Sequence, residues 1–244
     1  MNLTSRGAGA YFEALRPQVA AFTSCDLFVL PPFTSLWAAR ERLRGSNVAW
    51  GAQDVHPDDE GAHTGDVSAS MLADLDCTYV EVGHSERRRD HGETDDLVAA
   101  KVEQVLRHSM TPIMCVGEPR QVPLGAACRH VSDQVRTGLE RVRPDDRRRV
   151  VIAYEPVWAI GVGAAAADPE HVSRMHVAIH EFLRSAEGGG VDTRVIYGGS
   201  VDESTAAALL AAHGVDGLFV GRAALDPARF AAIVAKAEER ARSI

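Results

Sequence analysis

The chain has no long apolar run, no excess of basic residues and almost no lysine. No stretch reaches the roughly 18 consecutive apolar residues of a membrane-spanning helix, and the N-terminus lacks the basic and apolar regions of a secretion signal. The formal net charge of -8 argues against nucleic acid, because phosphate backbones are bound by basic surfaces. These absences predict a cytoplasmic protein that binds neither membranes nor nucleic acid.

Cysteine is also sparse, and its spacing excludes two classes of site. The four residues form no C-x-x-C pair and are too few for a disulfide scaffold: Cys25, Cys77, Cys115 and Cys128. We therefore expect reduced thiols and no metal. The only two lysines are Lys101 and Lys236.

What is present is a regular alternation of helical patterns and short apolar runs. With 244 residues, 45% of them hydrophobic, the chain can bury one large core. A helical pattern over 9–21 comes first. Seven strands are then predicted at 26–30, 47–53, 78–83, 111–117, 150–155, 193–197 and 217–221. Strands separated by helices at these intervals predict one α/β domain over residues 1–244 with a parallel sheet.

The stretch around Glu155 organises the functional interpretation. Strand-forming residues end in this carboxylate, and Pro156 cannot continue the ladder, so Glu155 is expected at the C-terminal end of a strand. An apolar segment closed by Gly161 and Gly163 follows, and glycines can act as hinges or bring N–H groups close to an anion. The pattern favours a catalytic base beside a lid, although a lone carboxylate at a strand end is more often merely solvated or salt-bridged.

Five motifs occur in order along the chain. They are Glu-Val-Gly-His-Ser-Glu-Arg-Arg (81–88), Cys-Val-Gly-Glu (115–118), Ala-Tyr-Glu-Pro-Val-Trp-Ala-Ile-Gly (153–161), Tyr-Gly-Gly-Ser (197–200) and Val-Gly-Arg (220–222). In order and spacing they resemble the triosephosphate isomerase family. The resemblance implies a TIM-type (β/α)8 barrel and a cofactor-free glycolytic and gluconeogenic isomerase of dihydroxyacetone phosphate and glyceraldehyde 3-phosphate.

The same resemblance assigns roles at the site. It implies Glu155 as the base and His84 as the neutral electrophile, with Ser85, Glu86 and Cys115 in support. It implies that the substrate phosphate is bound by residues from three loops: Gly161, Ser200, Gly221 and Arg222. Trp158 is expected to pack the lid.

The polar loop over 54–68 matches the segment through which subunits of the family interlock. Thr64 is expected near its tip, and a homodimer is implied. Loops of this length in compact domains are usually functional.

The beginning of the sequence departs from the family pattern. The family starts with a strand that carries Asn-x-Lys, and Met1-Asn2 align just after that lysine. Either the natural chain begins earlier, or this is a seven-stranded derivative with exposed edges at the strands beginning at 26 and 217. The activity of the sequence as written is therefore in question. Lys101 and Lys236 are both expected outside the barrel, and Glu86 is expected to be a semi-buried carboxylate without its partner.

Two further departures affect the choice of substrate. Val162, Ala164 and Ala165 stand where the family usually has a threonine and a Lys-Thr pair, and Arg222 replaces a glycine. Together with Asp54 and His56, these features are similar to the branch that acts on four-carbon erythrulose phosphates in erythritol breakdown. A tetrulose phosphate isomerase is therefore one alternative, and a non-catalytic barrel that binds phosphorylated metabolites is another.

Overall fold

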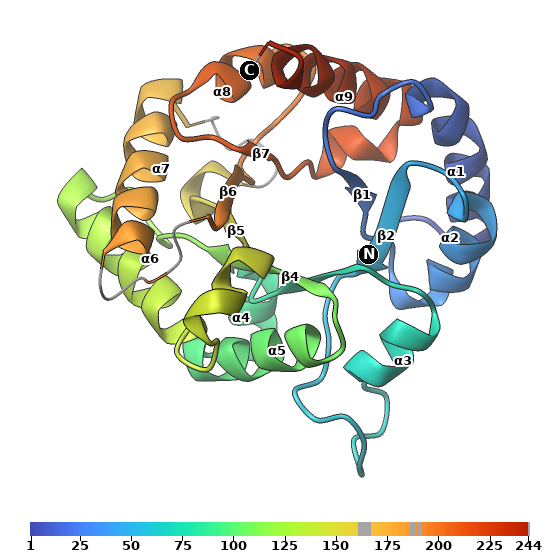
Figure 1. Cartoon of the computed structure of the whole chain (residues 1–244), viewed down its shortest axis with the longest axis horizontal. Coiled ribbons are helices and arrows are strands. Elements are labelled where there is room, and N and C mark those ends of the chain that lie inside the picture. The colour runs from blue at the N-terminus through green and yellow to red at the C-terminus, as the bar shows by residue number, and fades with distance from the viewer. Residues whose placement is uncertain (161–166, 186–188, 190–191, 244) are drawn as a thin grey trace.

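The computed structural model describes residues 1–160, 167–185, 189 and 192–243, and these form a ring of parallel strands surrounded by helices (Figure 1). Each described strand pairs with the next in chain order: β1 (Leu27–Val29), β2 (Val48–Ala52), β3 (Tyr79–Val82), β4 (Thr111–Val116), β5 (Val151–Tyr154), β6 (Arg194–Tyr197) and β7 (Gly217–Leu218). The predicted α/β barrel-type architecture is confirmed, with seven strands and a helix first.

The helices form the outer layer. Their bounds are α1 (Ser5–Val19), α2 (Leu36–Leu43), α3 (Ala69–Asp74), α4 (Ser85–His91), α5 (Asp95–Arg107), α6 (Leu124–Gly138), α7 (Pro169–Arg184), α8 (Ala206–Ala211) and α9 (Pro227–Ala241). Short 3₁₀ helices are η1 (Phe33–Ser35), η2 (Pro144–Arg149), η3 (Val157–Ala159) and η4 (Arg222–Leu225). Helix α1 begins before the predicted Gly9 because the Thr4 hydroxyl accepts a bond from Gly7 N–H at 3.3 Å and caps it.

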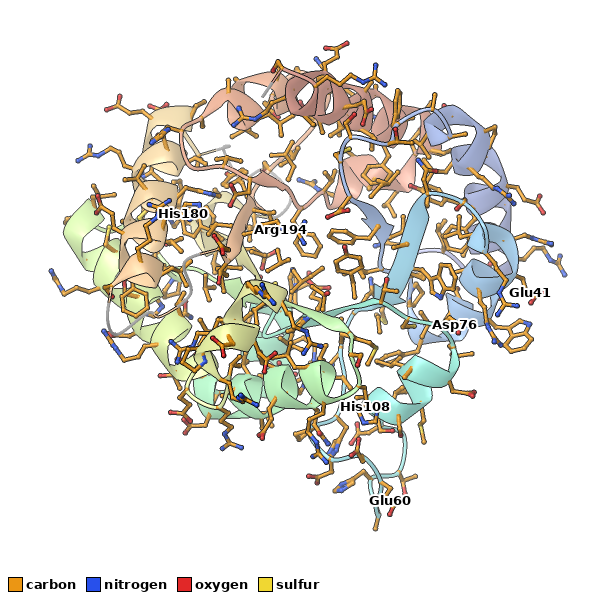
Figure 2. All side chains as sticks on the ribbon, viewed as in Figure 1. Glu41, Glu60, Asp76, His108, His180 and Arg194 are labelled. Atoms are coloured by element: carbon orange, nitrogen blue, oxygen red, sulfur yellow. The ribbon has the colours of Figure 1, made fainter. Side chains whose placement is uncertain are left out.

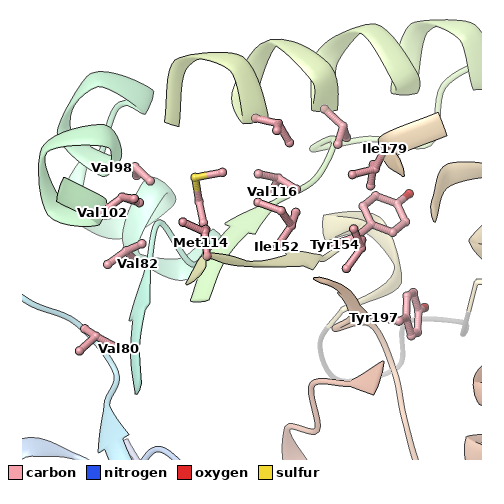
Figure 3. Packing of buried hydrophobic residues seen from close by; sticks show 14 of the residues in the cluster. Val80, Val82, Val98, Val102, Met114, Val116, Ile152, Tyr154, Ile179 and Tyr197 are labelled. Atoms are coloured by element: carbon pink, nitrogen blue, oxygen red, sulfur yellow. The ribbon is translucent and has the colours of Figure 1, made fainter. Parts of the chain in front are cut away.

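Alternation along the strands separates two cores. Outward-facing side chains of β3, β4 and β5 pack beneath the helices (Figure 3), among them Val80, Val82, Met114, Ile152 and Tyr154. The alternate residues form a second cluster within the barrel, including Ile113, Cys115, Val151, Ala153 and Ile196. The register aligns Glu81 with Ile113 and Cys115 with Ala153, so it places the barrel-facing side chains in layers.

The junction between the first and last strands, here called the seam, is closed by helices. No ladder joins β7 to β1 in the described residues, but α1 packs against α9 through a cluster that contains Leu15 and Phe230. Glu238 of α9 accepts bonds from the N–H groups of Thr23 (3.1 Å) and Ser24 (2.8 Å). Inside the barrel, the aromatic rings of Phe28 and Phe219 lie with their centroids 6.2 Å apart.

The loop over 54–68 projects from the ring, and the labelled Glu60 lies in this projection (Figures 1 and 2). The two arms of the loop are joined by His56 N–H, which donates to Val67 O at 2.8 Å, and a 2.6 Å contact between Asp59 and His108 fixes the loop to the body. Thr64 is exposed, as expected of a loop tip. Across the described ranges, no helix combines the length and apolarity that crossing a membrane requires.

Candidate active site

The C-terminal ends of three neighbouring strands bring a base, an imidazole and a second carboxyl together. His84 Nε2 lies 3.6 Å from Glu155 Oε1 and 3.9 Å from Glu81 Oε1. Cys115 Sγ lies 3.8 Å from the same Glu81 oxygen. Glu81, Cys115 and Glu155 converge because each occupies a barrel-facing position of its strand or directly follows one.

Glu155 is a buried carboxylate at the barrel mouth. It is only 4% exposed, and its Oε2 is buried without a hydrogen-bond partner among the described residues. Burial raises the pKa of Glu155, while His84, the Cys115 thiol and the Ser85 N–H oppose that rise. A raised pKa makes the carboxylate a stronger proton acceptor. Ser85 and Cys115 lie near it, and their supporting roles stay predictions.

The space for this carboxylate depends on Gly198. A Cβ at that position would lie 2.7 Å from Glu155 Cγ and 3.0 Å from its Oε1. The first glycine of the Gly198-Gly199 pair therefore serves close approach, in addition to the phosphate-loop role expected for this segment.

The orientation of His84 fixes its tautomer. Its Nδ1 accepts a bond from Glu86 N–H at 3.3 Å, and this interaction caps α4. A backbone amide can only donate, so in the neutral ring the proton is on Nε2, which faces Glu155. Burial opposes the charged ring, but the carboxylates of Glu155, Glu81 and Glu86 outweigh burial and raise the pKa of His84.

Gly83 and Arg88 hold the turn that carries His84. Gly83 has a φ of 70°, a left-handed conformation that favours glycine. Arg88 donates from Nε to Gly83 O at 2.7 Å and from a terminal nitrogen to Cys115 O at 3.2 Å. One guanidinium therefore fixes the end of β3 relative to β4.

One expectation about a charged residue is wrong, and a second charged residue lies where expected but is buried. The Glu86 side chain is 67% exposed and not semi-buried, because its N–H bonds the cap while its carboxylate extends from the first turn of α4. Lys101 lies in the outer helical layer, as expected, but it is only 3% exposed. Its Nζ contacts Asp54 at 2.6 Å and Glu93 at 2.5 Å, and this paired acid environment accounts for a buried ammonium.

The proposed phosphate-binding residues are partly described. Ser200 Oγ donates to Ala159 O at 2.9 Å, next to the segment that leads toward the lid. Gly221 directly precedes η4, and Arg222 opens it, after β7. Gly161 and the substituted lid positions Val162, Ala164 and Ala165 lie outside the described residues. The phosphate-binding roles therefore stay predictions.

The segment after Glu155 is anchored by an acid to which the sequence interpretation gave no role. Trp158 Nε1 donates to Glu118 Oε1 at 2.7 Å, and Tyr154 OH donates to the same oxygen at 3.1 Å. Glu118 is only 1% exposed. Its place in the Cys-Val-Gly-Glu motif, just after a strand, was a usable signal. Glu118 therefore fixes the Trp158 ring, and the lid packing expected of Trp158 stays a prediction because residues 161–166 lie outside the described residues.

Glu81 is the other residue that sequence reasoning missed. The alternation of side chains along the strand could have revealed it. A strand that points Tyr79 into the barrel must also point Glu81 there, whereas Val80 and Val82 face the helices. A carboxyl at such a position is costly unless its environment compensates.

Some described residues have the spacing of a metal site. Donor atoms of His56, Asp58 and His63 lie within 4.8 Å of one another, but the aspartate and one histidine are exposed, and such groups commonly occur without an ion. Glu81, His84 and Glu155 have the same spacing, but a carboxylate beside an imidazole can equally transfer a proton, because proton transfer uses the same lone pairs. The expectation of no metal stays a prediction.

Comparison with known proteins identifies close relatives. The family model described as triosephosphate isomerase matches residues 1–237. A protein of Thermus thermophilus named triosephosphate isomerase is 46% identical over 237 residues, covering 96% of this chain and 94% of its own. Proteins of the same name from Roseiflexus sp. and Symbiobacterium thermophilum are 46% and 41% identical, covering 96% and 99% of this chain and 93% and 96% of their own.

Proposed function

Because the chain belongs to the triosephosphate isomerase family, we propose that it interconverts dihydroxyacetone phosphate and glyceraldehyde 3-phosphate. The observation that carries the proposal is the pairing of a buried Glu155, one oxygen unpartnered, with His84 Nε2 at 3.6 Å. The barrel mouth supplies the base and the hydrogen-bond donor that an aldose–ketose isomerisation needs.

The reaction follows from that pairing. Glu155 removes a proton from C1 of the ketose, the electrons of the C–H bond form a C1–C2 double bond, and the C2 carbonyl becomes an enediolate oxygen. His84 stabilises this oxygen through Nε2–H, which the Glu86 N–H at Nδ1 favours. The hydroxyl proton on the C1 oxygen moves to the C2 oxygen through His84 Nε2, which leaves the negative charge on the C1 oxygen. The electrons of the C1–C2 double bond then take the proton back from Glu155 at C2, while a lone pair of the C1 oxygen forms the aldehyde C=O.

The environment of Glu155 suits this task. Water would compete for the carboxylate and would protonate the enediolate in unwanted positions, and burial of the base excludes it. Ser200, Gly221 and Arg222, with Gly161, are proposed to hold the substrate phosphate through N–H donors at the loop ends.

We also propose that two copies associate through the loop over 54–68. What supports this is the projection of the loop from the ring, the bond between its two arms from His56 to Val67, and its tie to the body through Asp59 and His108. Sedimentation of the chain at several concentrations, with Thr64→Arg as a variant at the tip, tests it. A dimer that Thr64→Arg weakens supports the loop interface, and a monomer at all concentrations contradicts it.

A second substrate class has one feature in its favour. Arg222 opens η4 at the end of β7, where the family usually has a glycine, and it adds a charged side chain beside the proposed phosphate-binding Gly221. A tetrulose phosphate is longer by one hydroxylated carbon and could use an additional donor there, so this remains the alternative substrate.

The experiment is isomerase turnover on triose and tetrulose phosphates side by side, with Glu155→Asp as the test variant. Shortening the base by one methylene should reduce kcat by about 10²-fold while changing the affinity for inorganic phosphate little. Turnover that Glu155→Asp leaves unchanged would remove Glu155 from the mechanism. Absence of turnover on both substrates, with phosphate still bound, would favour the non-catalytic barrel.

A further inference from the structure

Glu81 has no part in the reaction scheme, although it faces the same imidazole as the base. Its Oε1 is 3.9 Å from His84 Nε2 and 3.8 Å from Cys115 Sγ, and the residue is 8% exposed. Two carboxyl groups therefore approach one nitrogen, 3.6 Å away for Glu155 and 3.9 Å away for Glu81. Such an arrangement cannot hold full negative charge on both acids without a large electrostatic cost.

We infer that Glu81 holds a proton in the resting enzyme, so that Glu155 is the single negative charge of the cluster and His84 stays neutral. This inference deepens the proposed function and rests on it for its catalytic consequence. Glu81 is a positioning residue here, since it acts through the charge state of His84.

The groups that face Glu81 all bear on that proton. His84 lies at the junction of β3 and α4, Cys115 comes from β4, Glu155 follows β5, and Asp54 follows β2. Burial is the main cause that raises the pKa of Glu81, His84 opposes it, Glu155 adds to it, and the pKa reaches about 8.

The neighbours leave little compensation for a second charge. Asp54 carries its own ion pairs with Lys101 at 2.6 Å and Arg87 at 2.8 Å, so those two cations are engaged away from Glu81. The Cys115 thiol is a weak donor, and burial raises its pKa well above the ordinary value, so it remains a thiol. Of the groups named, only His84 could balance an ionised Glu81, and it would have to become an imidazolium.

The consequence for catalysis follows from the position of that charge. An ionised Glu81 would compete with the substrate oxygen for the Nε2 proton and would repel the developing enediolate. A protonated Glu81 does neither. Activity should therefore fall as pH rises through about 8, with Glu81 as the titrating group.

The first measurement reads the proton directly and requires no activity. The chain is labelled with ¹³C at the glutamate side-chain carboxyl, and the NMR titration is compared with that of Glu81→Gln, with the exposed Glu41→Gln as the assignment control. The signal missing in Glu81→Gln should titrate near pH 8. A signal that titrates below pH 5 would overturn the inference.

The second measurement is the pH profile of kcat/KM for the wild type, Glu81→Gln and Glu81→Leu. Glutamine copies a protonated carboxyl and cannot ionise, so Glu81→Gln should keep activity at pH 7 within about threefold and lose the alkaline decline. Glu81→Leu removes the polar group and tests whether shape alone is sufficient. An alkaline decline that persists in Glu81→Gln, or a loss of about 100-fold at pH 7, would contradict the inference.

The two measurements separate this inference from the proposed function. A wild-type chain without turnover on either sugar phosphate would contradict the proposed reaction, while the NMR titration would still decide whether Glu81 holds a proton. A wild-type chain that turns over substrate, with Glu81 ionised at pH 7, would leave the isomerase standing and overturn the inference alone.

Discussion

The two sides of the ring solve different problems with the same kind of residue. On the β3–β5 side, Glu81 and Glu155 are buried carboxyls with raised pKa values, because burial outweighs the donors near them, the Ser85 N–H beside Glu155 included. At the seam, Glu238 is equally buried at 2% exposure, yet it accepts N–H bonds from Thr23 and Ser24. A buried carboxyl with few hydrogen-bond donors tends to hold a proton, whereas one that accepts several N–H bonds stays charged and links two segments of the structure.

The largest effect should come from opening the seam. Leu15→Ala removes a fully buried side chain between α1 and α9 and should lower the free energy of unfolding by about 2–5 kcal/mol. Urea denaturation measures this, with the half-exposed Leu3→Ala as control. The folded fraction should keep its kcat. A matching loss of kcat would mean that the seam and the catalytic side are not separable.

The complementary change strikes the catalytic side. Gly198→Ala places a methyl group 2.7 Å from Glu155 Cγ, and displacing the base should reduce kcat by about 10²-fold. Gly9→Ala in α1 is the matched control, because a Cβ there meets nothing within 4 Å. Steady-state kinetics should show normal kcat for the control, with unchanged or slightly higher stability. Normal kcat in Gly198→Ala would show that Glu155 has room to move.

Glu238 gives the seam a dependence on acid. Burial by itself would raise its pKa, but bonds from Ser24 and Thr23 lower it to about 2, below its ordinary value of 4.5. The stability it contributes is therefore present above pH 4.5 and is lost as pH falls toward 2. Thermal unfolding of Glu238→Gln should show a weaker dependence across this window than the wild type or the exposed neighbour variant Glu239→Gln. If Glu238→Gln and the wild type depended equally on pH, the charged Glu238 would not be what stabilises the seam.

The stability that Glu81 contributes depends on pH in the opposite direction to that of Glu238. Its folded-state pKa is raised, so its contribution is complete below pH 4.5 and is lost as pH rises to about 8. Unfolding measured from pH 5 to pH 9 should therefore show stability declining more in the wild type than in Glu81→Gln. If the stability of the wild type and of Glu81→Gln changed equally with pH, Glu81 would not differ from Glu238 in the direction of its pH dependence.

The smallest effect is expected from a change at Arg222, and it concerns the choice of substrate. Arg222→Gly restores the residue usual for the family at the end of β7 and should shift the tetrulose-to-triose ratio of kcat/KM by about tenfold or less. Competing-substrate kinetics measures the ratio. An unchanged ratio would mean that Arg222 does not select chain length.

Much of this organisation could be predicted from the sequence. The seven strands, the helix that precedes them, and Glu155 and His84 at strand ends follow from apolar periodicity, proline and glycine placement, and the ordered motifs. The start of helix α9 is also readable from the sequence, because Asp226 caps it and Pro227 opens it, and both signals are local.

The missed features depend on contacts between distant segments. Lys101 became buried because Asp54 and Glu93 meet it, and the helical pattern of α5 does not reveal these partners. The Glu86 side chain extends outward because its backbone N–H donates to His84 Nδ1 at the start of α4. The residue type alone does not reveal this orientation. Only spatial pairing could also have shown that Gly198 makes room for Glu155.

The seam also sets an order of events during synthesis. The bond from Thr23 N–H to Glu238 spans 215 residues, and α1 finds its packing partner in the last helix of the described chain. Contacts of such sequence separation are slow to form. Helix α2 can pack against α1 as soon as residues 36–43 have emerged, but a ribosome must release almost the entire protein before the α9-facing side of α1 is covered. Until then that side is exposed to chaperones and to other chains.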